Sequence, residues 1–451
     1  MTAPGFATAL ADRAQDLLDR CTRCGDCFSV CPMTGPAGIA DAPASETVGG
    51  VLGLLAGGAT TPAAERWAAT CSGSGSCIPA CREGINPRFM LSLAKLALAR
   101  RADDETRRLR GHAAFRAMSR GVQVLSRIQM PPEELARFSR DDAEGPAPEV
   151  VFYTGCNLLK TPHIGLLCFD ILERMGVSYK VMGGPGDCCG VLQFRTGDID
   201  GSARIADRTA ERFGRFKASR VLSWCPTCQV QMTENVLPGR WNQNVDGTSY
   251  EMEAFVAFIE RHLDRLRPHL TQPVRKRVGL HEHPGISGVS TAAERILRAV
   301  PGLEFVDLAQ PKVGWMCNTL QPLPDFKASL HAELLEAAAA AGVTTLAGVY
   351  HACHREICSH QRDWPFEVVN FLELVGESMG IAHEDHFKRL KMLQDVDAIV
   401  ADVADLVSVH GLKPQEVRSV VIEALLAEQP LALRGPAPPS RTEIPHSHGD
   451  L

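Results

Sequence analysis

The sequence predicts a multidomain α plus α/β protein with a helical N-terminal domain, two α/β repeats and a helical C-terminal extension. Strand-like and helix-like segments alternate from about residue 147 to 380, as in parallel α/β units, and helical periodicity flanks this region. The 16 cysteines also fall into three separate groups along the 451 residues. The expected domains are a helical domain over 1–110, a helical linker over 111–146, a first α/β domain over 147–275, a second and degenerate one over 276–380, a helical extension over 381–434 and a disordered tail over 435–451.

Local patterns define the individual elements. Ala and Leu recur every three or four residues in 5–20, and 88–110 has the same periodicity and ends in a charged run. After a pair of prolines and a polar stretch, the apolar run 149–154 (EVVFYT) predicts the strand that opens the first α/β domain. Residues 385–430 are helical in pattern, and the Pro-rich segment after them predicts a disordered tail.

Composition excludes several classes of function. The 47 basic and 53 acidic side chains give a net charge of −6, which argues against a nucleic-acid-binding protein. The longest charge-free apolar runs, 48–59 and 337–350, are shorter than the ~20 residues of a transmembrane helix. The N-terminus has acidic residues at Asp12 and Asp16 and no basic region typical of a secretion signal. We therefore expect a cytoplasmic protein, with peripheral attachment to the inner membrane as the alternative.

The first cysteine group has the spacing of an iron–sulfur site. Residues 21–32 (CTRCGDCFSVCP) place four thiols on a short turn followed by a proline. Two-cluster ferredoxins have this pattern, and in them the fourth cysteine ligates the other cluster. The alternative is a zinc site with four cysteine ligands, but zinc ligands usually come as two separated CxxC pairs.

A partner motif follows with one ligand missing. Residues 71–81 (CSGSGSCIPAC) supply Cys71, Cys77 and Cys81, while Ser74 stands where a further cysteine is expected. Arg82 also replaces the usual proline. Three thiolates favour a 3Fe–4S cluster, and the alternative is an incomplete 4Fe–4S site with Ser74 or water on the fourth iron.

These two motifs, followed by Gly-Ile-Asn-Pro at 84–87, resemble the helical ferredoxin domain of the iron–sulfur subunits of succinate dehydrogenase and fumarate reductase. In that family the second motif holds a 3Fe–4S cluster near a quinone. The resemblance implies a 4Fe–4S cluster on Cys21, Cys24, Cys27 and Cys81, and a 3Fe–4S or incomplete 4Fe–4S cluster on Cys31, Cys71 and Cys77.

The second cysteine group lies at the ends of three predicted strands. Cys156 ends EVVFYTGC, the pair Cys188 and Cys189 follows VSYKVM and a Gly-rich turn, and Cys225-Pro-Thr-Cys228 follows RVLSW. The carboxyl ends of parallel strands are where α/β sheets build ligand sites. Five convergent thiols exceed what zinc requires.

This pattern resembles the CCG domain in the B-type subunit of heterodisulfide reductase, and related domains of glycolate oxidase and anaerobic glycerol-3-phosphate dehydrogenase. A helical ferredoxin fused ahead of two CCG domains resembles the C-type and B-type subunits of that reductase joined in one chain, as in its D-type subunit, over about residues 15–380. The resemblance implies a non-cubane 4Fe–4S cluster bound by Cys156, Cys188, Cys189, Cys225 and Cys228.

The second repeat has lost most of these cysteines. A shift of 128 residues places Cys189 on Cys317 and Cys225 on Cys353, but it places Cys156, Cys188 and Cys228 on Pro284, Met316 and Glu356. The second repeat therefore cannot hold the same cluster by the same ligands. It remains rich in potential ligands, since His281, Glu282, His351 and Glu356 also lie there. A zinc or different iron site and a decayed repeat kept for packing are both open. The residues proposed for a metal are Cys317, Cys353, Cys358, His283 and His354.

The most favoured function is an iron–sulfur electron-transfer subunit of a heterodisulfide-reductase-like oxidoreductase complex. It would pass electrons between a partner flavoprotein or other iron–sulfur subunit and a quinone, membrane subunit or thiol/disulfide acceptor. The chain has no GxGxxG fingerprint or P-loop, so no flavin or nucleotide of its own is expected. The alternatives are a catalytic thiol–disulfide reductase acting at the CCG cluster, whose catalytic residues the sequence does not identify, and a zinc-bound nonredox scaffold.

Overall fold

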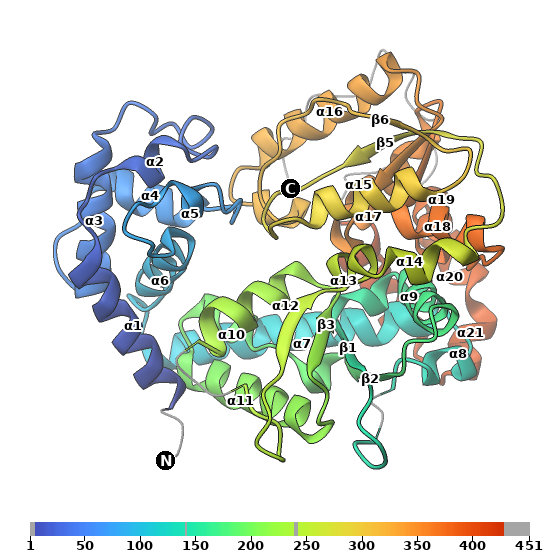
Figure 1. Ribbon diagram of the computed structural model, residues 1–451, viewed down its shortest axis with the longest axis horizontal. Coiled ribbons are helices and arrows are strands. Elements are labelled where there is room, and N and C mark those ends of the chain that lie inside the picture. Colours follow the sequence, from blue (N-terminus) through green and yellow to red (C-terminus); the bar gives the residue numbers. More distant parts are fainter. Residues whose placement is uncertain (1–4, 140–141, 239–241, 428–451) are drawn as a thin grey trace.

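Helices alone form the N-terminal domain of the computed structural model, which describes residues 5–139, 142–238 and 242–427 (Figure 1). The predicted helix over 5–20 is confirmed, and the cysteine motifs lie in short helices and turns between longer ones. The helices are α1 (Phe6–Arg20), α2 (Asp26–Ser29), α3 (Ala44–Ala56), α4 (Pro62–Thr70), α5 (Cys77–Ala80), α6 (Pro87–Ala99), α7 (Asp104–Arg127) and α8 (Pro132–Ala136).

The helix predicted over 88–110 is in fact two helices. Helix α6 ends at Ala99, and α7 begins at Asp104 and continues to Arg127, past the expected domain boundary at residue 110. The break is local, because the side chain of Asp103 accepts a hydrogen bond of 2.8 Å from the backbone N–H of Thr106 and caps α7. The sequence did not predict this break between α6 and α7, because the residues on both sides of Asp103 have helical periodicity.

The first α/β domain contains a four-stranded parallel sheet in the order β2-β1-β3-β4. The chain passes from β1 outward to β2 and then returns across β1 to β3, which makes the carboxyl ends of β1 and β3 the topological switch point. The strands are β1 (Val150–Gly155), β2 (Tyr179–Gly183), β3 (Arg220–Ser223) and β4 (Glu251–Ala254); the helices are α9 (Pro162–Arg174), α10 (Val191–Thr196), α11 (Ile199–Arg215), α12 (Pro226–Val230), α13 (Phe255–Arg261) and α14 (Leu263–Leu266).

The second α/β domain repeats this topology with the order β6-β5-β7-β8, again all parallel. The predicted multidomain α plus α/β class is therefore confirmed. The strands are β5 (Arg277–His281), β6 (Glu304–Val306), β7 (Thr345–Gly348) and β8 (Glu367–Asn370); the helices are α15 (Val289–Ala299), α16 (Pro324–Ala340), α17 (His351–Ile357) and α18 (Phe371–Met379).

The two repeats pack against each other through equivalent helices. Helix α13 contacts α15, and α9 contacts α18 (Figure 1). Since α9 and α15 follow the first strand of each repeat, and α13 and α18 the last, the interface is approximately two-fold. The carboxyl ends of both sheets, which bear the cysteines, are consequently held in a fixed relation by apolar helix packing.

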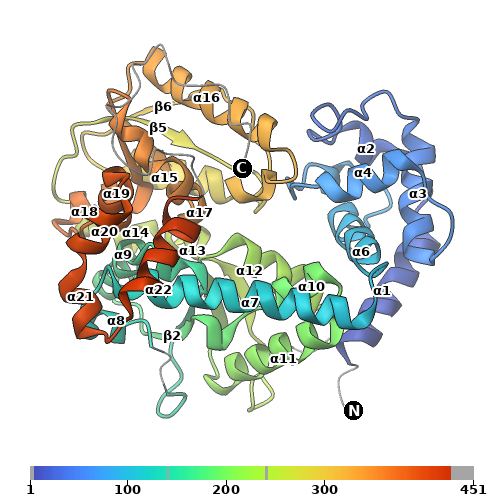
Figure 2. The same cartoon turned by 180° about the vertical axis from the view of Figure 1, so that it is seen from behind.

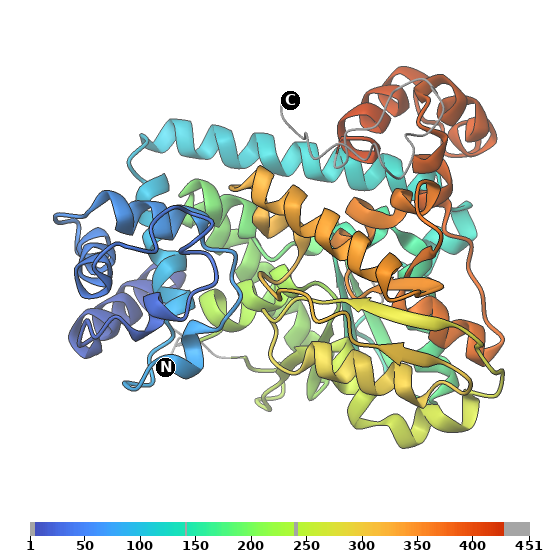
Figure 3. The ribbon, with the colours of Figure 1, turned by 90° about the horizontal axis from the view of Figure 1, so that it is seen from above.

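A C-terminal helical segment packs against the C-terminal end of α7 (Figures 2 and 3). It consists of α19 (His386–Leu393), α20 (Val396–Asp402), α21 (Ala404–Val409) and α22 (Pro414–Val420), as the helical pattern of 385–430 predicts. Its apolar residues share a buried cluster with Val124, Leu125 and Ile128. Within the described residues no helix is both long and apolar enough to cross a membrane. The predicted tail over 435–451 lies outside the described residues.

Candidate metal centres

The first group of thiols in the N-terminal domain lines one small cavity. Cys21, Cys24, Cys27 and Cys81 all contribute to its wall. Gly25 has φ +89°, which lets the chain turn between the second and third of these cysteines. Burial and the neighbouring thiols raise the pKa of Cys27 to about 12, so a metal must displace protons to bind here. Cys24, by contrast, is exposed.

The second group consists of Cys31, Cys71 and Cys77, and their thiols interact electrostatically with one another. Burial is the main cause that raises the pKa of Cys71 and Cys77. The indole N–H of Trp67 donates to the sulfur of Cys31 at 3.3 Å. Cys81 thus lies with three cysteines of the first motif and Cys31 with two of the second, while Cys27 also interacts with Cys77 across the two groups.

The hydroxyl of Ser74, which lies between Cys71 and Cys77 in the sequence, is already hydrogen-bonded to other residues. Its oxygen lies 3.1 Å from the hydroxyl of Ser72 and accepts a hydrogen bond of 2.7 Å from the backbone N–H of Gly314. Gly73, with φ +77°, packs so closely on the ring of Trp315 that a Cβ would lie 2.1 Å from it. The loop before Cys77 is thus held by the second repeat.

Arg88 joins all three domains. Its guanidinium forms an ion pair with Glu234 of the first α/β domain and donates to the carbonyl oxygens of Gly73, at 3.0 Å, and Gly285. Asn86 donates to the same carboxylate at 3.1 Å. Both partners of the ion pair are largely buried, so the segment after the Gly-Ile-Asn-Pro motif positions the N-terminal domain on the two repeats.

The five cysteines of the first α/β domain form a continuous buried chain of contacts. Cys156 lies within hydrogen-bonding reach of Cys188, Cys188 of Cys189, Cys189 of Cys228, and Cys228 of Cys225. Hydrogen bonds from neighbouring thiols lower the pKa of Cys188 and Cys225. These two thiols are therefore the ones that the surroundings favour as thiolates.

Backbone turns and a residue of the second repeat complete this site. Gly190, the glycine of the CCG triplet, has φ +78°, and a Cβ there would lie 2.7 Å from the carbonyl oxygen of Ser202. The imidazole of His351, at the start of α17, hydrogen-bonds Cys225 and helps to lower its pKa. His351 is almost completely buried, so the second repeat closes the site of the first.

A cavity of about 400 Å³ is lined by residues of all three domains, among them Cys71 of the N-terminal domain. Both Lys95, which is half-buried, and Arg195, which is exposed, line this cavity. Desolvation lowers the pKa of Lys95, and attraction to Cys71 opposes this effect. Trp315 of the second repeat forms part of the wall.

The second repeat brings four potential ligands together at the equivalent edge of its sheet. The ligand atoms of His281, His283, Cys317 and Cys353 all lie within 4.8 Å of one another. The sulfur of Cys317 is 3.0 Å from His281 Nε2 and 3.5 Å from His283 Nε2. Attraction to the two histidines and the hydrogen bond with Cys317 outweigh burial and lower the pKa of Cys353.

Two of the five residues predicted for a metal in this repeat lie elsewhere. His354 hydrogen-bonds Asp385 at 2.6 Å, in a separate buried group with His163 and Glu373. Cys358 lies in an apolar core, where burial raises its pKa to about 12. Of the predicted set of Cys317, Cys353, Cys358, His283 and His354, the structure brings together Cys317, Cys353 and His283, joined by His281, and places Cys358 and His354 apart from them.

The alignment of the repeats also needs a correction. Strands β3 and β7 are each separated by two residues from the next helix, so Cys228 and Cys353 are both the third residue of that helix. Cys353 therefore corresponds to Cys228, and Tyr350 to Cys225, whereas the shift of 128 had paired Cys225 with Cys353. The shift of 128 residues holds at the first strand of each repeat, β1 and β5. At the third strand of each repeat, β3 and β7, the shift falls to 125, because the register of β5 with β7 is then the same as that of β1 with β3.

Sequence reasoning missed three contributors to these sites. His351 gave no signal that it would contact a cysteine of the other repeat, and Lys95 and Arg195 lie in ordinary amphipathic helices. His281 was visible only as one of several ligand types near the end of a predicted strand. Contacts between residues so far apart in the chain have no local sequence pattern.

Comparisons with known proteins agree with the motifs. The CCG family model, a cysteine-rich domain, matches residues 150–233. The chain is similar to the D-type subunit of dihydromethanophenazine:CoB–CoM heterodisulfide reductase from Methanosarcina mazei, with 22% identity over 81% of this chain and 94% of that protein. The corresponding protein of Methanosarcina acetivorans is 21% identical over 81% of this chain and 95% of its own length.

A second kind of relative also matches. The B-type subunit of fumarate reductase (CoM/CoB) from Methanothermobacter marburgensis is 26% identical over 187 residues, which are 40% of this chain and 35% of that protein. No solved structure matches the chain significantly. The expected similarity to the D-type subunit of heterodisulfide reductase, with a CCG domain, is confirmed.

Proposed function

We propose that this chain is an iron–sulfur electron-transfer subunit of a larger oxidoreductase complex. The observation that carries the proposal is that the fold brings cysteines together in three separate groups within one chain. Similarity to subunits of heterodisulfide and fumarate reductases supports it. A flavoprotein or another iron–sulfur subunit would be one redox partner, and a quinone, a membrane subunit or a thiol/disulfide compound the other.

The donor sets fit the cluster types that the motifs imply. The group of four thiols suits a 4Fe–4S cluster, the group of three a 3Fe–4S cluster, and the group of five a non-cubane 4Fe–4S cluster. When bound, such clusters supply one-electron transfer at potentials set by charge and hydrogen bonding. The ligand sets are Cys21, Cys24, Cys27 and Cys81; Cys31, Cys71 and Cys77; and Cys156, Cys188, Cys189, Cys225 and Cys228.

Side chains around the thiols would stabilise their negative charge. Trp67 and His351 direct ring N–H groups at Cys31 and Cys225. Lys95 lies near Cys71, and Arg195 near Cys189, Cys225 and Cys228. Donors and cations of this kind stabilise thiolates in buried surroundings, where an uncompensated charge is costly.

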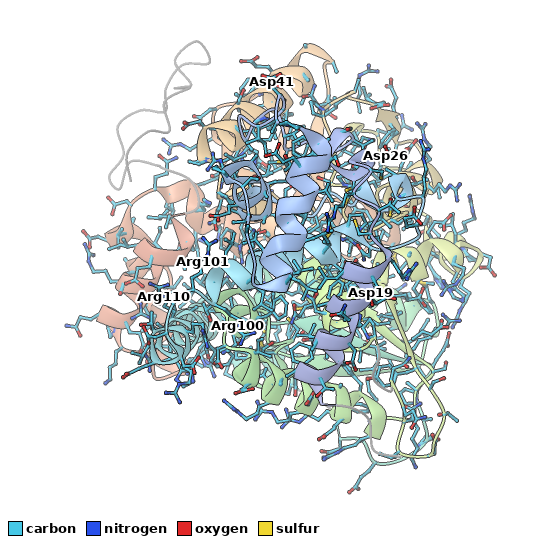
Figure 4. The ribbon with its side chains drawn as sticks, turned by 90° about the vertical axis from the view of Figure 1, so that its left-hand side faces the viewer. Asp19, Asp26, Asp41, Arg100, Arg101 and Arg110 are labelled. Atoms are coloured by element: carbon cyan, nitrogen blue, oxygen red, sulfur yellow. The ribbon has the colours of Figure 1, made fainter. Side chains whose placement is uncertain are left out.

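The outer face of the N-terminal domain is the proposed docking surface for a redox partner. Cys24 is exposed there, whereas the cysteines of the first α/β domain are buried. Figure 4 shows Asp19 and Asp26 on this face, with Arg100 and Arg101 toward the edge formed by α7. Asp26 is paired with Arg82 at 3.2 Å, so charges of both signs lie beside the four-thiol group on this face.

A thiol–disulfide reaction at the first α/β domain is a second candidate function, which the 400 Å³ cavity favours. A small molecule inside it would lie beside Arg195, which neighbours the thiols of the five-cysteine group. Its anionic groups would be attracted by Lys95 and Arg195. Under this proposal, these residues bind and orient the compound.

Metal analysis of the anaerobically purified full chain tests the main proposal. We expect about 11 irons and about 12 sulfides per chain, from one 3Fe–4S and two 4Fe–4S clusters. The Cys189→Ser variant should lose about four irons, because one thiolate of the five-cysteine group is removed, and should keep the signals of the N-terminal clusters.

Cys168→Ser is the matched control, since Cys168 is buried in α9 of the same domain but outside the thiol group. It should retain all of the iron. Unchanged iron and sulfide in Cys189→Ser, or a wild-type chain that contains zinc in place of iron and sulfide, would contradict the proposal.

A further inference from the structure

We propose that the second repeat binds one tetrahedral divalent metal ion, of which zinc is the expected one, through His281, His283, Cys317 and Cys353. No iron–sulfur cluster is assigned to this position. The site is independent of the three clusters proposed above, and its metal content can be measured whether or not those assignments hold.

The distances between the ligand atoms suit such an ion. Zinc bonds of about 2.0–2.1 Å to nitrogen and about 2.3 Å to sulfur place tetrahedral ligands roughly 3.3–3.8 Å apart. Cys317 Sγ lies 3.0 Å from His281 Nε2 and 3.5 Å from His283 Nε2, and all four ligand atoms fall within 4.8 Å. Only small adjustments would centre an ion among them.

The charge of the group also suits a buried divalent ion. Two thiolates and two neutral imidazoles around a doubly charged cation give a complex with no net charge. Cys317, Cys353 and His283 are buried, and His281 is half-buried, so a net charge would be costly here. The carboxylate of Glu356 also lies within 4.8 Å of Cys317, but it is paired with Lys327 at 2.9 Å and so leaves the charge balance of the group unchanged.

A second contact fixes the orientation of one ligand. His283 Nδ1 lies 2.6 Å from the carbonyl oxygen of Val313, to which it donates when Nε2 faces the other ligands. Hydrogen bonds of this type from the outer ring nitrogen to a backbone carbonyl are typical of metal-binding histidines. The same contact selects the tautomer that leaves Nε2 free to bind a cation.

The position in the fold corresponds to the five-cysteine site of the first repeat. His281 ends β5, Cys317 follows β6, and Cys353 lies in the first turn after β7. At the structural equivalents of Cys156 and Cys225, the second repeat has Pro284 and Tyr350, neither of which offers a ligand comparable to a thiolate. Two thiols and two imidazoles suit one mononuclear ion better than a four-iron cluster.

The metal site would also hold the loop 313–317, which contacts the N-terminal domain. Val313 is bound by His283 at one end of this loop, and Cys317 is a ligand at the other. Between them, Gly314 donates to Ser74 and Trp315 packs on Gly73. A metal ion in the degenerate repeat would therefore support the docking surface for the loop that separates Cys71 from Cys77.

Metal content and zinc X-ray absorption of the full chain test the proposal. Protein purified anaerobically after growth with added zinc should contain about one zinc per chain, with an absorption fine structure of two sulfur and two nitrogen ligands at the distances above. Cys317→Ser and His283→Gln should each lower the zinc content at least tenfold. Cys358→Ala, which removes a buried thiol of the same domain outside the group, should retain it.

The wild-type spectrum keeps the proposal falsifiable if the ligand variants fail to fold. Zinc far below one per chain, or a zinc spectrum dominated by oxygen or by four sulfur ligands, would overturn the site. Zinc retained in both ligand variants would also overturn it. The link to the N-terminal domain rests on the proposed function: loss of zinc should alter the signal of the cluster at Cys31, Cys71 and Cys77. An unaltered signal in a zinc-free variant would refute that link but not the site.

Discussion

The hydroxyl oxygen of Ser74 accepts a hydrogen bond of 2.7 Å from the backbone N–H of Gly314, a residue 240 positions away in the sequence. The spacing of residues 71–81 predicts a cysteine ligand at the position of Ser74. Ser74 is instead buried and hydrogen-bonded both to the second repeat and to Ser72. The oxygen that would have to replace a thiolate is therefore already engaged in joining two domains.

We expect the cluster at Cys31, Cys71 and Cys77 to contain three irons, because a hydroxyl is a harder and far less acidic ligand than a thiol. The oxidised wild type should show the near-isotropic spin-half EPR signal of a 3Fe–4S cluster. Ser74→Cys should abolish this signal and lower the potential of the site. Ser72→Cys, which adds a thiol to the same loop outside the motif position, should leave the signal in place. A diamagnetic oxidised site with four irons in the wild type would contradict the prediction.

The ion pair between Arg88 and Glu234 should contribute strongly to domain packing. Arg88→Met leaves the carboxylate of Glu234 largely buried without its guanidinium partner, which typically costs about 3–5 kcal/mol. Thermal unfolding should start at a markedly lower temperature than in the wild type. The double variant Arg88→Met/Glu234→Met should recover part of the loss, because no unpaired charge remains. Equal unfolding temperatures for Arg88→Met and the wild type would show that the pair is not a stabilising contact.

Arg195 should raise the reduction potential of the cluster held by the five cysteines. Arg195→Met removes a cation near Cys189, Cys225 and Cys228, and thereby disfavours the added negative charge of the reduced state. At about 1 kcal/mol for a nearby charge in a hydrated site, the potential should fall by on the order of 40 mV. Redox titration followed by EPR measures the shift. Arg204→Met, on an exposed part of α11, is the control and should leave the potential unchanged; an equal shift in both variants would argue against a local effect.

The buried pair of His163 and Asp385 should make stability depend on pH. Burial opposes ionisation of His163, but Asp385 and Glu373 outweigh it and raise its pKa above the ordinary 6.5. Burial also opposes ionisation of Asp385, but His163, His354 and Lys388 lower its pKa. The contribution of His163 is thus complete below pH 6.5 and is lost as the pH rises through the raised pKa. That of Asp385 is complete above pH 3.8 and is lost as the pH falls through the lowered one.

His163→Gln should reduce the decline of stability on the alkaline side, measured as the unfolding temperature from about pH 6 to 9. The exposed residue His112 offers a control, since His112→Gln should leave the decline unchanged. An identical pH profile for the wild type and His163→Gln would exclude the pair as its cause.

The sequence alone predicted the groups of cysteines whose members are close along the chain or lie at strand ends. The spacing in 21–31 and 71–81 places thiols on adjacent turns. The alternation of strands and helices requires parallel sheets, and parallel strands bring Cys156, Cys189 and Cys225 to one edge. These features depend on local backbone geometry, which the pattern of residues specifies directly.

Tertiary structure alone decided which of the remaining polar residues meet. Cys353 and His354 are neighbours in sequence, but successive residues of a helix point about 100° apart. Cys353 therefore faces His281 and His283, while His354 faces Asp385 and His163 on the other side of α17. The sequence could supply all of these ligand types, but only the packing of α17 between the two repeats assigned each to its own site.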